Sequence, residues 1–139
     1  MQTTRELGIS LIPYSPLARG LVTNKLNVAT LADDDFRRTL PRYQQENMTN
    51  NNRLVLEFAN FASTKNCTPA QLALAWVLAQ GEDIIPIPGT KKRKYLEENV
   101  GAIEVNLTTA DLTAINDLIK RYPITGERYS EGAMKMVNH

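Results

Sequence analysis

The stretch Ile84–Asn99, with the sequence IIPIPGTKKRKYLEEN, combines several kinds of chemistry in sixteen residues. Its first residues, Ile84–Ile87, form a continuous apolar run of the kind that predicts a strand buried on both faces. Gly89 then allows a close approach of the backbone to a ligand, and Thr90 adds a hydroxyl group. The stretch therefore begins as a buried strand that ends in a small, polar turn.

The second half of the same stretch adds charge and hydrogen-bonding groups. A helix is expected to start after the turn, and the free N–H groups and dipole at a helix start favour an anion. Lys91 and Lys92 add two full positive charges, while Glu98 and Asn99 offer the acceptor and donor atoms that suit a base edge. These features predict a site for a nucleotide that carries an extra phosphate. The alternative is a solvated basic helix start followed by a surface acid-amide pair.

A second turn of interest follows the apolar run Ile9–Pro13, which also predicts a strand. Ser15 and Pro16 come directly after this run, and ligands of parallel α/β proteins bind at the carboxyl ends of strands. A Ser-Pro turn without any function is the alternative interpretation. If the two strands are neighbours, their carboxyl-terminal turns lie side by side and form one site.

Helical patterns occupy much of the remaining sequence. Residues 53–65 place apolar side chains on one face. Pro69–Gln80 begins with a capping box made by Thr68 and Gln71 and is apolar nearly all round, which predicts a buried helix. A short helix is expected in residues 91–103. Another is expected in residues 107–120, where Thr108 and Asp111 predict a second capping box. Residues 16–50 and 121–139 show no sustained period, so both segments are expected to be irregular.

This order of elements predicts an α/β fold with parallel strands, because the strands are separated by helices. Only two strands are predicted, and two buried parallel strands cannot cover both their faces and their edges. The sequence therefore indicates part of a larger sheet.

Composition excludes several classes of function. The 139 residues suffice for one domain, and the net charge of +1 gives no broad field for nucleic acid or a membrane surface. A single cysteine, Cys67, and a single histidine, His139, exclude an internal disulfide and a metal site of the Cys/His kind. The sequence has neither an apolar run of the ~20 residues that a membrane helix needs nor the pattern of a signal peptide, so a cytoplasmic protein is expected.

Five motifs in order resemble the C-terminal half of an aldo-keto reductase. They are RELGISLIPYSPLARGLVTNK, DDFRRTLPRYQQEN, TPAQLALAWVLAQ, IPIPGTKKRKYLEENVGAIEVNLT and GERYSEGAMKMVN. The resemblance is greatest to the bacterial and plant branch related to the potassium-channel β subunits. It implies that residues 1–139 are the seventh and eighth βα units and the tail of a (β/α)8 TIM barrel that binds NADP(H), and that the barrel is incomplete here.

The resemblance also implies the roles of individual residues toward the cofactor. Ser15, Pro16 and Leu17 would contact the pyrophosphate and ribose, with Arg19 beside them, while Lys25 would reach a phosphate. Arg38 would help to close the long loop over the cofactor. The residues implied for the other end of the nucleotide are Gly89, Thr90 and Lys91 for the 2′-phosphate, Glu98 and Asn99 for the adenine, and Tyr95 for stacking on it.

No catalytic residue is expected in this chain. The Asp, Tyr, Lys and His with which the family reduces carbonyl compounds lie on earlier strands, so the resemblance implies a chain that is inactive alone. The alternatives are a non-catalytic module that binds a nucleotide or pairs with a partner, and a truncation product without a selected role.

Unpaired strand edges also predict self-association. The helix Pro69–Gln80 would expose an apolar side, which includes Leu72, Leu74, Trp76 and Leu78, in the absence of the rest of the barrel. Exposed apolar surface drives association, so a dimer, a larger assembly or aggregation is expected.

Overall fold

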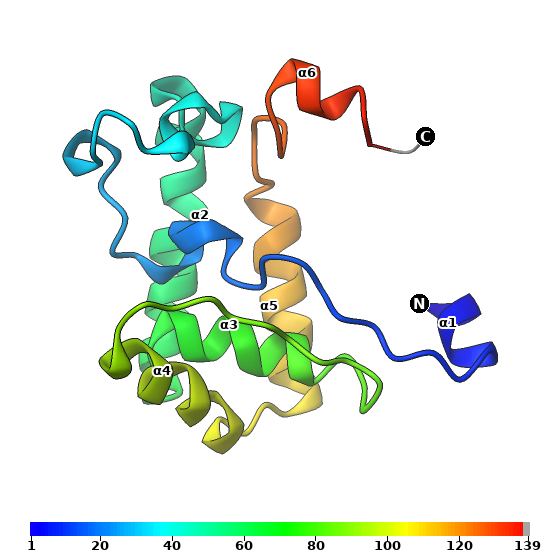
Figure 1. The fold of residues 1–139 in the computed structure, drawn as a ribbon. Coiled ribbons are helices and arrows are strands. Elements are labelled where there is room, and N and C mark those ends of the chain that lie inside the picture. Colours follow the sequence, from blue (N-terminus) through cyan, green and yellow to red (C-terminus); the bar gives the residue numbers. More distant parts are fainter. Residues whose placement is uncertain (138–139) are drawn as a thin grey trace.

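The computed structural model describes residues 1–137, in which the long helix α2 (Gln45–Thr64) is central to the core and the N-terminal segment extends away from it (Figure 1). Helices α3 and α5 and the 3₁₀ segments η1 and η4 all contact α2. The first half of α2 packs in one apolar cluster and the second half in another. The first cluster contains Leu21, Leu40, Tyr43, Met48 and Val55, and the second contains Phe58, Ala62, Leu72, Ala73 and Ile115. α2 therefore joins the two parts of the core.

The other helices have the following bounds. The α-helices are α1 (Gln2–Glu6), α3 (Pro69–Leu78), α4 (Arg93–Val100), α5 (Thr109–Arg121) and α6 (Glu131–Met134). The 3₁₀ segments are η1 (Ala18–Thr23), η2 (Val28–Thr30), η3 (Phe36–Thr39), η4 (Pro41–Tyr43) and η5 (Gly101–Glu104). None of these helices, within residues 1–137, is long and apolar enough to cross a membrane.

Helix α3 starts as the sequence predicts and is buried, although it ends at Leu78 and not at Gln80. The Thr68 hydroxyl accepts the N–H of Gln71, and the Gln71 side chain accepts the N–H of Thr68, which completes the predicted capping box. The prediction that Leu72 and Leu74 are exposed is wrong, because α2, α4, η1 and η5 cover this helix within the chain. Trp76 and Leu78 remain half-buried.

Helix α5 carries the second predicted capping box, between Thr108 and Asp111, and inserts Ile115 into the core. Lys65, at the end of α2, donates a hydrogen bond of 2.8 Å to the Asp111 carboxylate. This bond and those from the backbone and side chain of Thr108 lower the pKa of Asp111 to about 2. One carboxylate thus caps α5 and ties it to α2.

The lowered pKa of Asp111 predicts how stability changes with pH. A carboxylate with a folded-state pKa of about 2, compared with about 3.9 in the unfolded chain, stabilises the fold fully above pH ~4. This contribution is lost as the pH falls from ~4 through ~2. Urea unfolding at several pH values should therefore show a smaller acid-induced loss for Asp111→Asn than for the wild type. An unchanged loss would contradict the role given to Asp111, and Asp117→Asn on the exposed face of α5 is the matched control.

The two predicted strands are extended segments in the structure, and the extent of their strand pairing was predicted wrongly. Within the described residues they meet at a single parallel bridge between Leu11 and Ile84. The Leu11 N–H donates to the Asp83 carbonyl at 2.8 Å, and the Ile85 N–H donates to the Leu11 carbonyl at 2.9 Å. The predicted parallel neighbourhood of the segments is confirmed by this bridge. Pro13 lacks the N–H group that would donate the next hydrogen bond of this ladder, and Pro86 and Pro88 lack N–H groups on the opposite edge of the second segment.

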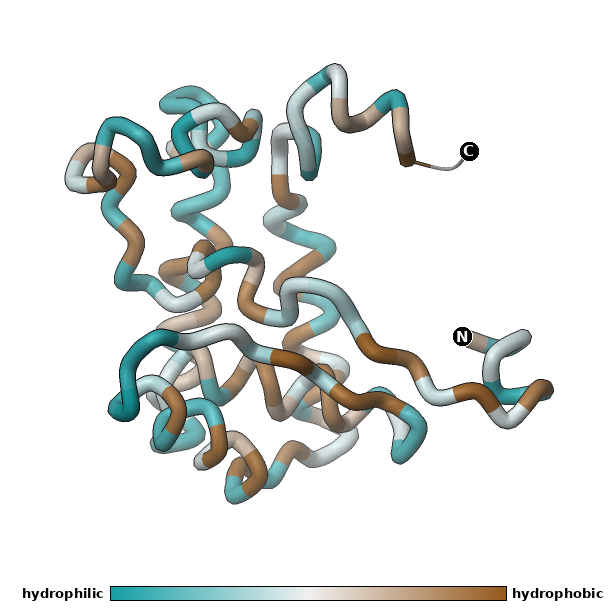
Figure 2. Tube along the Cα trace, viewed as in Figure 1, coloured by the Kyte–Doolittle hydropathy of each residue, from teal (hydrophilic) through white to brown (hydrophobic). Residues whose placement is uncertain are grey.

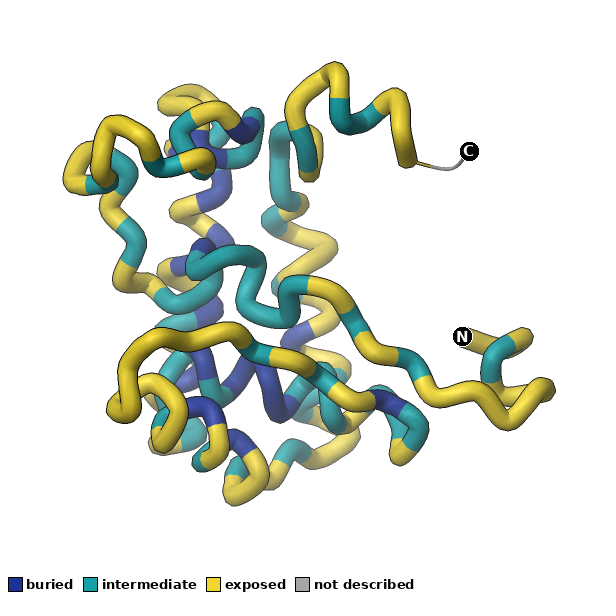
Figure 3. Tube along the Cα trace, viewed as in Figure 1, coloured by how far each residue is buried: buried dark blue, intermediate teal, exposed yellow. Residues whose placement is uncertain are grey.

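The predicted burial of these two segments on both faces is also wrong. Ile84 is 5% exposed, but the other four isoleucines in the two segments are more than half exposed (Ile9, Ile12, Ile85 and Ile87). Figure 3 shows the N-terminal segment, residues 1–14, mostly in the colour of exposed residues, and Figure 2 shows hydrophobic residues, in brown, along the same trace. Within residues 1–137 no further strand lies beside this pair of segments, so these side chains stay uncovered.

The segment of residues 16–50, predicted as an irregular loop, contains η1 to η4 and contributes Leu21, Leu40, Tyr43 and Met48 to the core. Helix α2 begins at Gln45, several residues before the predicted start of helical pattern. The tail is irregular as predicted, apart from the single turn α6. His139 lies outside the described residues.

Buried Asn51 explains how the tail is held against α2. Its amide N–H₂ group donates to the carbonyls of Arg42 and Thr125 at 3.0 Å each, and its amide oxygen accepts the N–H of Thr125 at 2.8 Å. Asn51 is only 1% exposed, so these bonds satisfy a polar group that would otherwise destabilise the core. One side chain thereby joins α2, η4 and the turn at Gly126.

Candidate functional site

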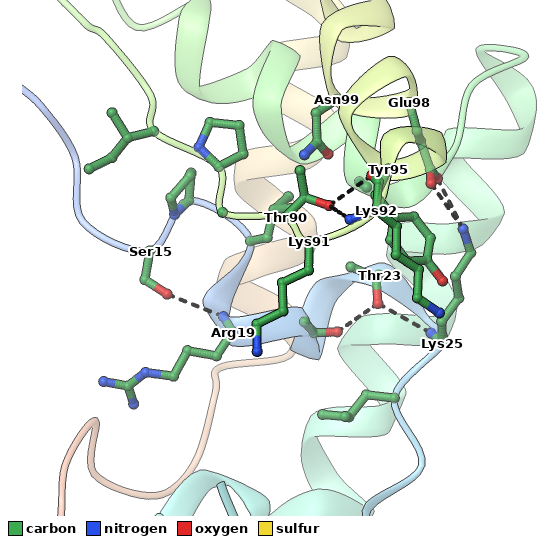
Figure 4. A pocket seen from close by; sticks show the side chains of 18 of the residues that line it. Ser15, Arg19, Thr23, Lys25, Thr90, Lys91, Lys92, Tyr95, Glu98 and Asn99 are labelled. Atoms are coloured by element: carbon green, nitrogen blue, oxygen red, sulfur yellow. Dashed lines mark hydrogen bonds and ion pairs between the residues drawn. The ribbon is translucent and has the colours of Figure 1, made fainter. Parts of the chain in front are cut away.

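A cavity of about 740 Å³ lies between the turn that follows the first extended segment and the turn that follows the second (Figure 4). Residues 15–26 form one wall, residues 87–92 form another, and α4 closes the third side. Its polar lining consists of Ser15, Arg19, Thr23, Lys25, Arg37, Thr90, Lys91, Lys92, Tyr95, Glu98 and Asn99. The neighbourhood of the two extended segments thus brings both polar turns to one site.

The turn at residues 15–20 is held in an unusual backbone conformation. Ser15, Ala18 and Arg19 have φ values of 55°, 46° and 53°, in the left-handed region that residues other than glycine seldom adopt. The Ser15 hydroxyl accepts the N–H of Arg19 at 3.2 Å, and the Ser15 carbonyl accepts the N–H of Ala18 at 2.8 Å. Strained backbone of this kind persists only where the surrounding structure holds it in place, and it is found most often at functional sites.

The opposite wall presents positive charge. Within residues 1–137, neither Lys91 nor Lys92 has a carboxylate within ion-pair distance, and both side chains are exposed. The Thr90 hydroxyl accepts the N–H of Lys92 and donates to its carbonyl, each at 3.2 Å, so it shapes the turn that carries the two lysines. A Cβ atom added at Gly89 would meet nothing within 4 Å, which leaves the backbone accessible.

An ion pair joins the long loop to α4 across the cavity. The Lys25 ammonium group lies 3.0 Å and 3.3 Å from the two oxygens of Glu98, whose side chain is only 12% exposed. Burial alone would raise the pKa of Glu98, but hydrogen bonds from Lys25 and Thr68 and the charges of Lys25 and Lys94 lower it. The ammonium groups of Lys25 and Lys92 lie 5.6 Å and 6.0 Å from the centre of the Tyr95 ring.

Eleven of the twelve residues predicted for the cofactor line this cavity, and Arg38 is the exception. The Arg38 guanidinium donates to the carbonyls of Leu31 and Ala32, at 2.6 Å and 2.9 Å, and lies 3.6 Å from Asp33. It therefore braces the loop outside the lining, and its role in closing the loop remains a prediction.

The neighbouring Arg37 lines the cavity and was missed by sequence reasoning. Its guanidinium is held by the Asp35 carboxylate, at 2.7 Å and 2.9 Å, and donates to the Arg19 carbonyl at 3.2 Å. These bonds from Arg37 lower the pKa of Asp35 to about 2. The Asp-x-Arg spacing was the only available signal, because Asp35 caps η3 and so turns Arg37 back toward the first wall.

This arrangement is suited to a polyanionic ligand with an aromatic group. The volume lies within the ~300–1,000 Å³ range of small-molecule sites. Cationic side chains and free backbone surround one part of the cavity, while Tyr95 and the buried amide of Asn99 line the part against α4. No group of three His, Cys, Asp or Glu side chains that could hold a metal ion occurs among the described residues.

Comparison with known proteins relates this chain to one family. The model of the aldo/keto reductase family matches residues 1–120. Aldo-keto reductase yakc from Schizosaccharomyces pombe, whose name includes NADP(+), is 46% identical over 134 residues, which cover 96% of this chain and 39% of the relative. Aldo-keto reductase str7 from Strobilurus tenacellus is 43% identical over 136 residues, covering 96% of this chain and 40% of that relative.

The fold of this chain is also similar to part of a solved structure. The glycerol dehydrogenase AKR11B4 from Gluconobacter oxydans superposes with a TM-score of 0.73 at 26% identity, over 89% of this chain and 38% of that chain. The chain thus spans about two fifths of the length of the curated relatives and of the solved structure that it matches.

Proposed function

Because this chain belongs to the aldo/keto reductase family, we propose that it is the C-terminal, NADP(H)-binding part of a carbonyl reductase. In this proposal residues 1–139 are the seventh and eighth βα units and the tail of a (β/α)8 barrel, from the branch related to the potassium-channel β subunits. The observation that carries the proposal is the cavity of about 740 Å³, which gathers polar residues from both turns.

The lining of the cavity supports NADP(H) as the ligand. Lys91 is available to a 2′-phosphate, and the open space above Gly89 allows that phosphate to approach the backbone. The Thr90 hydroxyl would bind the same phosphate by exchanging its hydrogen bond to the Lys92 carbonyl for one to a phosphate oxygen. Tyr95 and Asn99 would face the adenine, and Ser15 with Arg19 would lie toward the pyrophosphate. One curated relative also carries NADP(+) in its name.

The chain's own part in the reaction is to bind and orient the cofactor. Bound NADPH supplies a hydride for a carbonyl carbon. The Lys25–Glu98 ion pair spans the cavity and would hold the loop over the cofactor. The resemblance assigns proton transfer to Asp, Tyr, Lys and His residues of preceding strands, so this chain alone would be inactive.

A second candidate function, a partner-pairing module, is favoured by the uncovered segments Ile9–Pro13 and Ile84–Ile87. Their exposed isoleucines and sparse backbone pairing suit the addition of further strands, supplied by a partner or a second copy. Light scattering after size-exclusion chromatography distinguishes an assembly from a monomer.

One experiment tests binding and inactivity together. The purified chain is mixed with NADPH and a simple aldehyde, and both the fluorescence and the absorbance of the dihydronicotinamide are followed. We expect a saturable fluorescence change and no oxidation above the rate without protein, because in this proposal the cavity binds the cofactor while the residues that transfer the proton belong to preceding strands. Robust turnover that is lost in Lys91→Ala would contradict the inactive part of the proposal. The absence of any fluorescence change would contradict binding.

A further inference from the structure

A second, smaller cavity of about 80 Å³ shares Ser15 and Arg19 with the first cavity and is otherwise lined mainly by arginines and tyrosines. Arg19 comes from the turn, Arg42 from η4 and Arg128 from the tail. Tyr14 and Tyr43 complete the aromatic part of its wall. Three segments that are distant in the sequence therefore each contribute an arginine to the wall of one small space.

These three guanidinium groups lack a carboxylate partner. In the part of the chain that the structure describes, none of them lies within 4.0 Å of an Asp or Glu oxygen. Arg37, by contrast, is paired with Asp35. Glu127 acts on Arg42 only through its charge at longer range. The cavity is therefore an uncompensated cluster of positive charge.

Two of the arginines, Arg19 and Arg42, are held in place by hydrogen bonds that use only some of their N–H groups. Arg19 donates to the Arg128 carbonyl at 3.1 Å and to the Tyr14 hydroxyl at 3.2 Å, and its guanidinium lies 5.1 Å from the centre of the Tyr129 ring. Arg42 donates through Nε to the Gly126 carbonyl at 3.1 Å. Because a guanidinium has five N–H groups, the terminal nitrogens of Arg42 remain for a ligand.

The electrostatic effects of this cluster agree with its geometry. Burial, together with the charges of Arg128 and Arg19, lowers the pKa of Arg42. The hydrogen bond and charge of Arg19 lower the pKa of the Tyr14 phenol. Positive charge is thus disfavoured and negative charge is favoured on two different walls of the same cavity.

We propose that this arginine-lined cavity binds a carboxylate group. Guanidinium groups present a planar fork that matches a carboxylate, and about 80 Å³ holds a group of that size, since a water molecule takes roughly 30 Å³. The buried hydroxyl of Tyr43 forms a polar wall and already donates to the Ala18 carbonyl at 2.6 Å.

The position of this carboxylate site also indicates a class of substrate. Ser15 and Arg19 line both cavities, so the carboxylate would lie beside the proposed cofactor. An aldehyde or ketone that also carries an acid group would fit this arrangement. The substrate class rests on the proposed function, whereas carboxylate binding by the arginines does not.

Binding to the intact chain tests this proposal by NMR titration, with succinate, its neutral analogue succinamide and inorganic phosphate as probes. We expect saturable binding of succinate, with shifts at residues 14–19 and 126–129, and no binding of succinamide. Arg42→Gln and Arg128→Gln should each weaken succinate binding about tenfold or more, because each removes a charge-assisted contact. Arg121→Gln, which removes an exposed arginine at the end of α5, is the matched control.

Three outcomes would overturn the proposal. These are a lack of saturable succinate binding, equal binding by Arg128→Gln and the wild type, and phosphate binding as tight as that of succinate, which would indicate a general anion site. Arg128 is exposed, so its variant should fold even if Arg42→Gln does not. Lys91→Ala should leave succinate binding unchanged. Loss of nucleotide binding with succinate binding retained would contradict only the proposed function, and the reverse would contradict only this inference.

Discussion

Replacement of Leu72 by alanine is expected to lower the free energy of unfolding by about 2–5 kcal/mol. Leu72 is fully buried, and it packs in the cluster that joins α3 to the second half of α2 and to α5 through Phe58, Ala62 and Ile115. The loss combines the transfer free energy of the removed methine and two methyl groups with the cost of the cavity left behind. Because small domains unfold with only ~5–15 kcal/mol, this loss would be a large fraction of the total.

Urea denaturation followed by circular dichroism measures this effect. The matched control is Leu56→Ala, which makes the same chemical change at an exposed position on α2 and should change stability by only a few tenths of a kcal/mol. Equal losses in the two variants would contradict the packing described for α2 and α3.

Replacement of Gly126 by alanine is expected to lower stability by about 2–5 kcal/mol for a different reason. Gly126 has a φ of 85°, where a residue with a Cβ atom costs ~1–3 kcal/mol. The added Cβ would also lie 2.8–2.9 Å from backbone atoms of Pro41 and Arg42, which overpacks the site by a similar amount. The turn must then move away from η4, which breaks the bond from Arg42 to the Gly126 carbonyl.

Gly132→Ala is the matched control for this substitution, because a Cβ atom at position 132 meets nothing within 4 Å. Thermal unfolding should show a clear drop in Tm for Gly126→Ala and little change for Gly132→Ala. A Gly126→Ala protein as stable as the wild type would contradict the close contact between the tail and η4. Movement of the turn at Gly126 should also disturb the small cavity, because Arg128, which lines that cavity, lies two residues after Gly126.

The sequence predicted correctly the elements that depend on contacts between residues close together in the chain. The capping boxes at Thr68 and Thr108 fix the starts of α3 and α5, and both form as expected. The two polar turns were also predicted to meet, because parallel segments bring their carboxyl ends together. Eleven of the residues expected there consequently line one cavity.

Features that depend on distant segments could not be predicted in the same way. The burial of Met48 and Tyr43 depends on contacts with Leu21 and Leu40, and nothing in the polar sequence before Asn50 signals those contacts. Asn51 looks like a polar surface residue until Thr125 and Arg42 supply its partners. The predicted burial of the two strands was wrong for the opposite reason. Ile9–Pro13 and Ile84–Ile87 have the composition of buried strands but lack neighbouring segments that would cover them.

Titration of the isolated chain with NADP⁺ and NAD⁺ tests most directly the central claim that it carries an NADP(H)-binding site. A charge-assisted contact with the 2′-phosphate contributes ~1.5–3 kcal/mol, so NADP⁺ should bind about tenfold or more tightly than NAD⁺. Lys91→Ala should abolish most of this difference by weakening NADP⁺ binding alone, while Lys94→Ala, on α4 outside the cavity lining, should preserve it. Equal affinities of the wild type for the two nucleotides, or a preference that survives Lys91→Ala unchanged, would contradict the claim.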